Sequence, residues 1–207
     1  MKKFKKKNWM IWCSELLSTA QTGLHYSKND HERERYLHVQ RIAISIMAYC
    51  SQCELTPQKL NLNSLKGYCT PQVTVRAIMF MKGKLILIHE KSSCSWNLPG
   101  GYADINDSPK EAVEREVLEE TNLIVRAKKI IAIFQSGKDQ LFNQYAIYFL
   151  CEITEQKTFE AQNLEIDDMK AVDIDDVDSL RLNQCLRDLW CKLKPLLIDP
   201  CDLTEFD

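Results

Sequence analysis

Three glutamates in the middle of this chain have the spacing of a shared site. Glu116, Glu119 and Glu120 stand at i, i+3 and i+4, within an arc of about 100° on a helix. The arc borders an apolar stripe, so three carboxylates there would repel one another and lose hydration, and Arg115 supplies only one positive charge. A hard divalent cation with oxygen ligands offsets both effects, which predicts a Mg²⁺ site where Mn²⁺ could substitute. A glutamate-rich surface helix is the alternative for these three residues alone.

The segment around the glutamates supplies the elements that would position them. Ser108 and Glu111 have the spacing of a capping box with Pro109 in the first turn, so a helix is expected over residues 109–121. Before it, the Pro-Gly-Gly sequence at residues 99–101 predicts a loop where backbone atoms can approach a ligand closely. A strand, a glycine loop and a helix that carries carboxylates together fit a metal-bridged phosphate site.

Hydrophobic periodicity predicts a sheet on both sides of this segment. From Pro71 onward apolar residues alternate with polar ones, and Lys82-Gly83 predicts a turn between two paired strands. The strands are expected at residues 73–80, 85–88, 130–134, 145–153 and 171–174. A further helix is expected over residues 182–193, ending before Pro195. The predicted class is α+β, a mixed sheet with flanking helices.

The beginning of the chain is expected to be helical. A stripe of apolar residues predicts one helix that ends at Gly23 and another that begins near Asp30. Thr56-Pro57 predicts the start of a short third helix, which ends before Gly67. Such helices bury little by themselves, so their apolar faces need the rest of the chain or a second copy.

Length and composition limit the class of protein. The 207 residues allow a helical subdomain at residues 1–66 and a sheet-containing domain at residues 67–207. A net charge of −2 argues against a strongly basic nucleic-acid binder, and the lack of a long apolar run argues against a membrane partner. Nine cysteines, an odd number, favour a reduced, cytoplasmic protein. The lysine-rich first seven residues are expected to form a solvated tail, with weak attraction for nucleotides or RNA as the alternative.

The stretch from Gly101 to Leu123 resembles the Nudix box, the signature of the Nudix hydrolase superfamily. The matching positions are Gly101, Arg115, Glu116, Val117, Glu119, Glu120 and Leu123. Asp107 replaces the first glutamate of the pattern, and Asn122 replaces its last glycine. The shorter Asp107 side chain suits a supporting role better than direct metal ligation, and asparagine tolerates the left-handed conformation that glycine usually supplies. We therefore expect the box to be catalytically intact.

Other segments resemble a Nudix subgroup with an N-terminal helical domain. They include residues 20–24 (Ala-Gln-Thr-Gly-Leu), 33–36 (Arg-Glu-Arg-Tyr) and 96–101 (Trp-Asn-Leu-Pro-Gly-Gly). Members of this subgroup are described as ADP-ribose or CDP-choline pyrophosphatases. The resemblance thus implies a Nudix α/β/α sandwich preceded by helices that help a homodimer to form.

The resemblance also implies roles for residues of the box. Glu116, Glu119 and Glu120 would hold metal ions, together with the backbone carbonyl of Gly100. Glu116 and Glu119 would also act in catalysis, and Arg115 would orient the glutamates rather than contact the substrate. Metal ions held in this way bridge phosphate oxygens and stabilise the developing charge.

Three residues outside this glutamate face are candidates for the rest of the site. The general base is either a box glutamate or Glu165, which opens an acidic stretch on a later loop. Arg76, on an expected strand, could hold a phosphate or lie at the surface. Tyr102, directly after Gly101, could stack on a base, line the pocket or serve the structure alone.

The leading hypothesis is a Mg²⁺-dependent hydrolase for a nucleoside diphosphate linked to a small moiety. The products would be a nucleoside monophosphate and a phosphorylated fragment, and the sequence does not choose between ADP-ribose and CDP-choline. One alternative is a Nudix enzyme that acts on RNA or its phosphorylated ends. Another is a non-catalytic, nucleotide-sensing Nudix domain, against which the full set of box glutamates argues.

Overall fold

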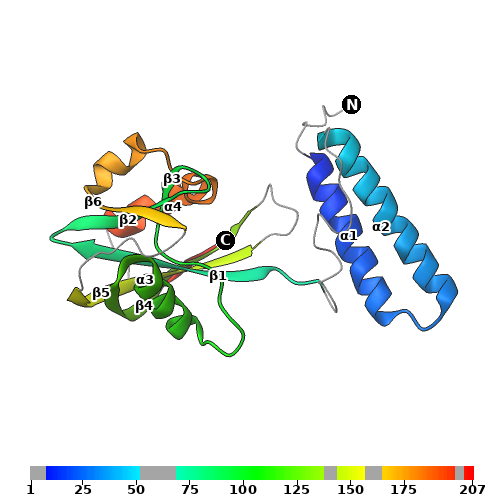
Figure 1. Cartoon of the computed structure of the whole chain (residues 1–207), viewed down its shortest axis with the longest axis horizontal. Coiled ribbons are helices and arrows are strands. Elements are labelled where there is room, and N and C mark those ends of the chain that lie inside the picture. The colour runs from blue at the N-terminus through cyan, green and yellow to red at the C-terminus, as the bar shows by residue number, and fades with distance from the viewer. Residues whose placement is uncertain (1–7, 52–68, 138–143, 157–164, 199–202) are drawn as a thin grey trace. The chain divides into compact units, whose positions relative to one another are not determined.

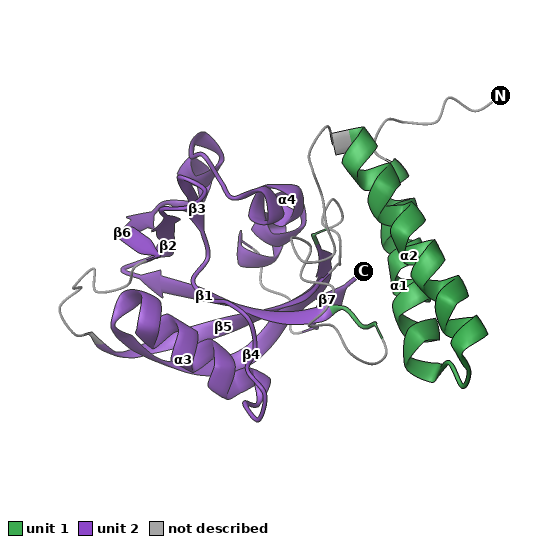
Figure 2. Ribbon diagram, turned by 45° about the vertical axis from the view of Figure 1, so that its right-hand side comes forward, with its two compact units in different colours: residues 1–71, 137–143 green, residues 72–136, 144–207 purple. Residues whose placement is uncertain are grey.

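The structure, a computed structural model, describes residues 8–51, 69–137, 144–156, 165–198 and 203–207. The chain divides into two compact units, residues 1–71 with 137–143 and residues 72–136 with 144–207 (Figure 1, Figure 2). The domain boundary expected after residue 66 lies outside the described residues, as does the third helix expected from Thr56. Both stay predictions.

Two helices form the described part of the first unit. α1 (Asn8–Tyr26) and α2 (Asp30–Ser51) lie side by side, and α2 begins where the sequence predicts (Figure 1). Asn29 Oδ1 accepts the Glu32 N–H at 2.9 Å and so caps α2. The helices share a small apolar core of Cys13, Leu17, Ala43, Ile44 and Met47.

The prediction that the first helix ends at Gly23 is wrong, because α1 continues to Tyr26. Gly23 lies against α2, where a Cβ atom on it would overlap the ring of Tyr36. The tyrosine ring therefore packs directly on the backbone of α1. Close approach of the two helices, rather than a helix end, accounts for the glycine.

Gly23→Ala is expected to destabilise this pair of helices, although alanine normally favours a helix over glycine by about 1 kcal/mol. The added methyl group would displace the Tyr36 ring, and overpacking of this kind costs about 1–3 kcal/mol. Urea unfolding of the full chain, followed by circular dichroism, measures the change in the free energy of unfolding. Thr19→Ala, at an exposed position of α1, is the control and should be neutral or stabilising. A Gly23 variant as stable as this control would contradict the packing argument.

A mixed sheet is the centre of the second unit. Its strands in the described residues are β1 (Gln72–Met81), β2 (Lys84–Glu90), β3 (Ser95–Asn97), β4 (Leu123–Ser136), β5 (Gln144–Gln156), β6 (Ile166–Val172) and β7 (Glu205–Phe206). Their order is β3-β2-β1-β5-β4-β7, with β6 paired to β2. β1 runs parallel to β5 and β4 to β7, while the other pairs are antiparallel. The predicted Lys82-Gly83 turn joins β1 to β2, with positive φ at both residues.

Helices cover both faces of the sheet, α3 below it and α4 above it in Figure 1. α3 (Pro109–Thr121) contributes Val113 and Val117 to the apolar core on its face. α4 (Gln184–Ile198) and the short 3₁₀ helix η1 (Ile174–Ser179) contribute to the core on the other face, for example through Leu186. Helices on both faces of a mixed sheet confirm the predicted α+β class.

The prediction that the last helix ends before Pro195 is wrong, because α4 continues to Ile198. Pro195 has no N–H to donate to the carbonyl of Cys191. Beyond it, however, Leu196 and Leu197 pack against the core on the α4 face, and this burial offsets the missing hydrogen bond. Neither α4 nor any other helix in the described part of the chain is long and apolar enough to cross a bilayer.

Two strands begin more than three residues before their predicted bounds, whereas the other three expected strands differ by at most three residues at either end. The strand expected at residues 130–134 begins at Leu123, because it pairs with β5 along most of its length. The strand expected at residues 171–174 is β6, which begins at Ile166 and pairs with β2. Ile174, expected in this strand, begins η1 instead.

Candidate active site

Helix α3 begins and ends where the sequence predicts. Its N-cap residue Ser108 accepts the Glu111 N–H at 3.2 Å, and Glu111 Oε2 accepts the Ser108 N–H at 2.9 Å, which completes the predicted capping box. At the other end Asn122 adopts the left-handed conformation expected for the last box position, with φ 56°. The two caps fix the register of the glutamates between them.

The glycine loop is pressed against β1. A backbone hydrogen bond of 2.9 Å runs from the Val75 N–H to the Gly101 carbonyl. Gly100 adopts φ +134°, and a Cβ atom on it would overlap the carbonyl oxygen of Val75. A Cβ atom on Gly101 would lie 2.5 Å from Glu116 Oε2. The first glycine thus permits close approach to the strand, and the second permits close approach to a box glutamate.

Glu120 joins the helix to the loop. Its Oε2 accepts the Gly100 N–H at 2.7 Å. Burial raises the pKa of Glu120 to about 8, although the Gly100 hydrogen bond and the charge of Arg76 act in the opposite direction. Burial also raises the pKa of Glu116, against the effect of its contact with Arg115. These neighbouring carboxylates therefore lack enough positive charge to offset their burial.

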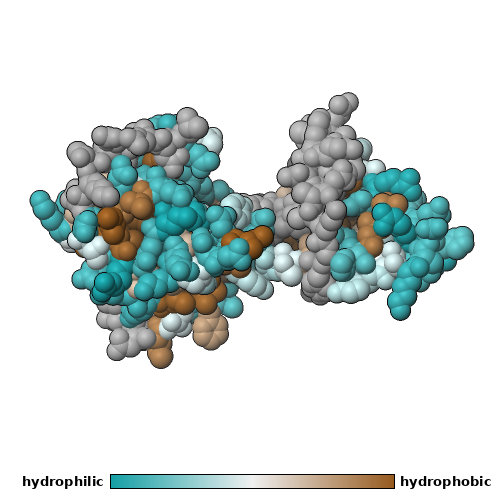
Figure 3. All heavy atoms as spheres, turned by 60° about the horizontal axis from the view of Figure 1, so that its bottom comes forward, coloured by the Kyte–Doolittle hydropathy of each residue, from teal (hydrophilic) through white to brown (hydrophobic). Residues whose placement is uncertain are grey.

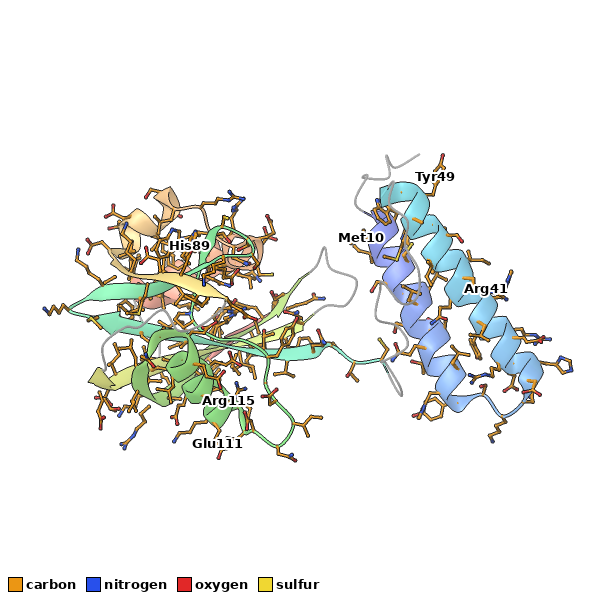
Figure 4. The ribbon with its side chains drawn as sticks, viewed as in Figure 1. Met10, Arg41, Tyr49, His89, Glu111 and Arg115 are labelled. Carbon is orange, nitrogen blue, oxygen red and sulfur yellow. The ribbon has the colours of Figure 1, made fainter. Side chains whose placement is uncertain are left out.

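Arg115 lies on α3, where Figure 4 labels it, and it is the centre of a network of carboxylates. Its guanidinium donates to Glu116 at 2.8 Å, to Asp107 at 3.0 Å and to Glu119 at 3.3 Å. Asp104 lies 3.3 Å from the same guanidinium, a contact that the sequence did not predict. The network supports the expectation that Arg115 orients the glutamates, with Asp107 in a supporting position, and this role stays a prediction.

Arg76 contacts the glycine loop from β1. Its Nη1 donates to the carbonyl of Leu98 at 3.2 Å and also to the carbonyl of Gly100. The Gly100 carbonyl, an expected metal ligand, is thus held by an arginine in the structure. Contact between Arg76 and a substrate phosphate stays a prediction.

Two candidate residues lie outside α3. Tyr102 follows the glycine loop, and Glu165 lies in a later segment of the chain. The Tyr102 side chain is half exposed, and its hydroxyl accepts Gln144 Nε2 at 2.7 Å. Glu165 is exposed directly before β6, and its carbonyl accepts the Lys91 N–H at 2.9 Å. Base stacking by Tyr102 and proton transfer by Glu165 stay predictions.

Two family models match this chain. Residues 70–192 match the NUDIX domain, and residues 7–60 match the UDP-X-like, N-terminal oligomerisation domain. The chain belongs to the Nudix family. It is accordingly a hydrolase that acts on diphosphate bonds, as the box predicted.

Individual relatives agree with this family. A putative ADP-ribose pyrophosphatase of Bacillus subtilis is 30% identical over 151 residues, which cover 71% of this Nudix chain and 73% of the relative. An ADP-ribose pyrophosphatase structure from Streptococcus suis matches with a TM-score of 0.55 and 27% identity, over 67% of this chain and 100% of that one. The crystal structure of a UDP-X diphosphatase matches with a TM-score of 0.60 and 22% identity, over 99% of this chain and 100% of that one, and supports the fold alone.

The donor chemistry of this Nudix site fits a divalent cation. Among the described residues, no group of three or more His, Cys, Asp or Glu side chains is arranged to hold a metal ion. Instead, Arg115 contacts Glu116 and Glu119, and the Gly100 N–H contacts Glu120. The raised pKa values of Glu116 and Glu120 nevertheless indicate that the nearby positive groups do not offset the lost hydration of these two carboxylates. Hard oxygen ligands of this kind suit Mg²⁺.

Glu90 is a residue of the Nudix site region that the sequence did not indicate. Its carboxylate accepts hydrogen bonds from Ser93, Asn97 and Asn183. Its charge also contributes to the raised pKa of Glu120, after burial and the charge of Glu116. No local pattern could reveal this cluster, because Asn183 is 93 residues away along the chain.

Proposed function

We propose that this Nudix hydrolase cleaves a nucleoside diphosphate linked to a small moiety, with Mg²⁺ as its metal and Mn²⁺ as a substitute. The substrate class includes ADP-ribose, CDP-choline and UDP-linked compounds. The partly buried carboxylates Glu116 and Glu120 beside the glycine loop carry the proposal, since a bound cation offsets their loss of hydration and neutralises a diphosphate. The names of two relatives, both ADP-ribose pyrophosphatases, favour a linked diphosphate over a nucleoside triphosphate.

In this proposal the metal is held by Glu116, Glu119 and Glu120 with the carbonyl of Gly100. Bound Mg²⁺ supplies charge neutralisation at the phosphate oxygens. Arg115 keeps Glu116 and Glu119 in position through its hydrogen bonds. The hydrogen bond from the Gly100 N–H keeps Glu120 facing the loop.

The reaction itself needs a base and a site for the rest of the substrate. Either a box glutamate, with Glu119 as the exposed candidate, or Glu165 takes a proton from the attacking water. The water oxygen bonds to one phosphorus while the P–O bond to the bridging oxygen breaks, which yields the monophosphate and the phosphorylated fragment. Arg76 contacts the glycine loop and would meet a phosphate bound beside that loop. The exposed ring of Tyr102 is available to stack on a base.

Glu119→Gln is expected to lower kcat by about 100-fold or more, because it removes one of the carboxylates that would hold the metal. Its melting temperature should stay close to that of the natural protein, since the Glu119 side chain is 54% exposed. Glu152→Gln, at a side chain that is 58% exposed on β5, is the matched control and should keep full activity. Turnover of the Glu119 variant at the natural rate with Mg²⁺ would remove the catalytic assignment.

A panel of nucleoside diphosphate derivatives with Mg²⁺ or Mn²⁺ tests the substrate class. Products are scored as phosphate released after a phosphatase is added, because each cleavage yields two phosphomonoesters. We expect hydrolysis of at least one linked diphosphate and little of nucleoside triphosphates. Hydrolysis only of triphosphates or of RNA 5′ ends would overturn the substrate class, and nucleotide binding without hydrolysis would overturn the enzymatic proposal.

The N-terminal helices are proposed to hold two copies of the chain together. Apolar side chains are exposed on them, and Figure 3 shows such side chains between polar ones on this unit. They include Ile11, Trp12, Leu16, Ile42, Ile46 and Tyr49. Tyr49, which is 87% exposed, projects from α2 (Figure 4). Sizing chromatography should give about twice the chain mass of 24.1 kDa, and a clean monomer would remove the homodimer.

A reduced, cytoplasmic location is proposed with this function. All seven cysteines in the described ranges are free thiols. Small nucleotide derivatives are the expected partners, and nucleic acid is not favoured because the net charge is −2.

A further inference from the structure

Glu90, the last residue of β2, accepts hydrogen bonds from three separate segments. Its Oε1 accepts Nδ2 of Asn97, at the end of β3, at 2.6 Å. Its Oε2 accepts Ser93 Oγ and Asn183 Nδ2, each at 2.8 Å. We infer that Glu90, outside the Nudix box, is a positioning residue that sets the glycine loop in place beside the box glutamates. The inference rests on the proposed function, which assigns this loop to the diphosphate site.

The contact with Asn97 leads directly to the loop. Asn97 is buried, and while its Nδ2 donates to Glu90, its Oδ1 accepts the Leu98 N–H at 2.9 Å. An ionised carboxylate can only accept, so Glu90 fixes which end of the Asn97 amide faces it and which end faces Leu98. Two residues farther on, the Gly100 N–H donates to Glu120. A short path through the loop therefore connects Glu90 with a box glutamate.

Glu90 also adds negative charge to the site. Burial is the main cause of the raised pKa of Glu120, and the charges of Glu116 and Glu90 act in the same direction. A further carboxylate near these two strengthens the attraction for a divalent cation. Glutamine at position 90 would lose this charge, and its amide would direct N–H groups at side chains that are themselves donors.

The contact with Asn183 leads away from the loop and provides a control. Asn183 precedes α4, and its Oδ1 accepts the Cys185 N–H at 3.0 Å, which caps that helix. The Asn183 backbone N–H donates to the Trp96 carbonyl at 2.8 Å. Removal of the Asn183 side chain would weaken the start of α4 but leave the contact between Glu90 and Asn97 in place.

The test compares Glu90→Gln, Asn97→Ala and Asn183→Ala in the full chain. For each variant we would measure the Mg²⁺ concentration at half-maximal hydrolysis, kcat and KM, and the melting temperature with and without Mn²⁺. Glu90→Gln and Asn97→Ala should each lower kcat/KM by about 10- to 100-fold, raise the half-saturating Mg²⁺ concentration by about tenfold, and reduce the rise in melting temperature on adding Mn²⁺. Asn183→Ala should lower the metal-free melting temperature but leave the half-saturating Mg²⁺ concentration unchanged.

Two results would overturn the inference. One is an unchanged half-saturating Mg²⁺ concentration in Glu90→Gln, and the other is an equal increase in all three variants, which would indicate a structural role alone. If Glu90→Gln does not fold, the half-saturating Mg²⁺ concentrations of Asn97→Ala and Asn183→Ala are compared instead. An increase in Asn97→Ala alone supports the inference, and equal values in the two variants overturn it. If the natural protein hydrolyses no nucleoside diphosphate derivative, the proposed function fails, while the Mn²⁺-dependent melting temperatures still decide the role of Glu90.

Discussion

Replacement of Glu120 by glutamine is expected to abolish metal-dependent hydrolysis and at the same time to stabilise the metal-free protein. Glu120 is partly buried, and its Oε2 accepts the Gly100 N–H, which a glutamine oxygen can also do. The substitution removes a partly buried charge but keeps the shape of the side chain and this hydrogen bond. Activity should fall by about 100-fold or more, because a carboxylate that would hold the cation is lost.

The stability change depends on pH in a direction that follows from the raised pKa. Burial moves the pKa of Glu120 from 4.5 to about 8, so between these values the unfolded chain releases a proton that the folded chain keeps. The contribution of this group to stability is therefore fully present below pH 4.5 and is lost as the pH rises to about 8. With a pKa shift of this size, the loss between pH 4.5 and pH 7 is on the order of 3 kcal/mol.

Urea unfolding in the presence of a chelator, at several pH values, measures this difference. The natural protein should lose stability toward pH 8, whereas Glu120→Gln should lose less. Addition of Mg²⁺ should raise the melting temperature of the natural protein more than that of the variant, because ligands stabilise only the state that binds them. Parallel stability curves for the two proteins would contradict the burial of an uncompensated charge at position 120.

Gly100→Ala is expected to disrupt the loop and the activity together. Gly100 has φ +134°, a conformation that costs other residues about 1–3 kcal/mol, and its Cβ would also overlap the Val75 carbonyl oxygen. That oxygen belongs to the backbone of a buried strand and cannot move aside as a side chain can. The loop must therefore shift, which separates the Gly100 N–H from Glu120. We expect a loss of about 3 kcal/mol or more in the free energy of unfolding and a loss of turnover.

Gly83→Ala is the matched control for this substitution. Gly83 also has a positive φ, +80°, but nothing lies within 4 Å of a Cβ atom added to it. This variant therefore carries the backbone strain alone, and it should lose about 1 kcal/mol and keep its activity. Thermal unfolding and turnover, measured side by side, separate strain from overlap. Equal losses in the two variants would show that the contact with Val75 is not the cause.

The side chains that would bind the metal lower the stability of the protein when no metal is bound. Two partly buried carboxylates, Glu116 and Glu120, have raised pKa values, and Arg115 is shared among several acidic side chains. A cation that relieves this imbalance would bind more strongly than it would to the same carboxylates in water. The site region therefore accounts for both the expected metal dependence and the expected gain in stability when one charge is removed.

The sequence by itself determined the features that depend on neighbouring residues. The capping box of Ser108 and Glu111 and the left-handed Asn122 defined α3 to the residue, and with it the spacing of the box glutamates. The alternation after Pro71 and the Lys82-Gly83 turn predicted β1 and β2. Such signals can be interpreted without the fold, because the groups that interact are within one helical turn or one hairpin of each other.

Only the tertiary structure decided the features that depend on packing between distant segments. Gly23 lies inside a helix because the Tyr36 ring packs on it, and α4 continues past Pro195 because the residues beyond are buried. The carboxylate of Glu90 meets Asn183 from 93 residues away. In each case the free energy gained by burial or by a distant hydrogen bond outweighs the local preference of the chain, and no short stretch of sequence contains both partners.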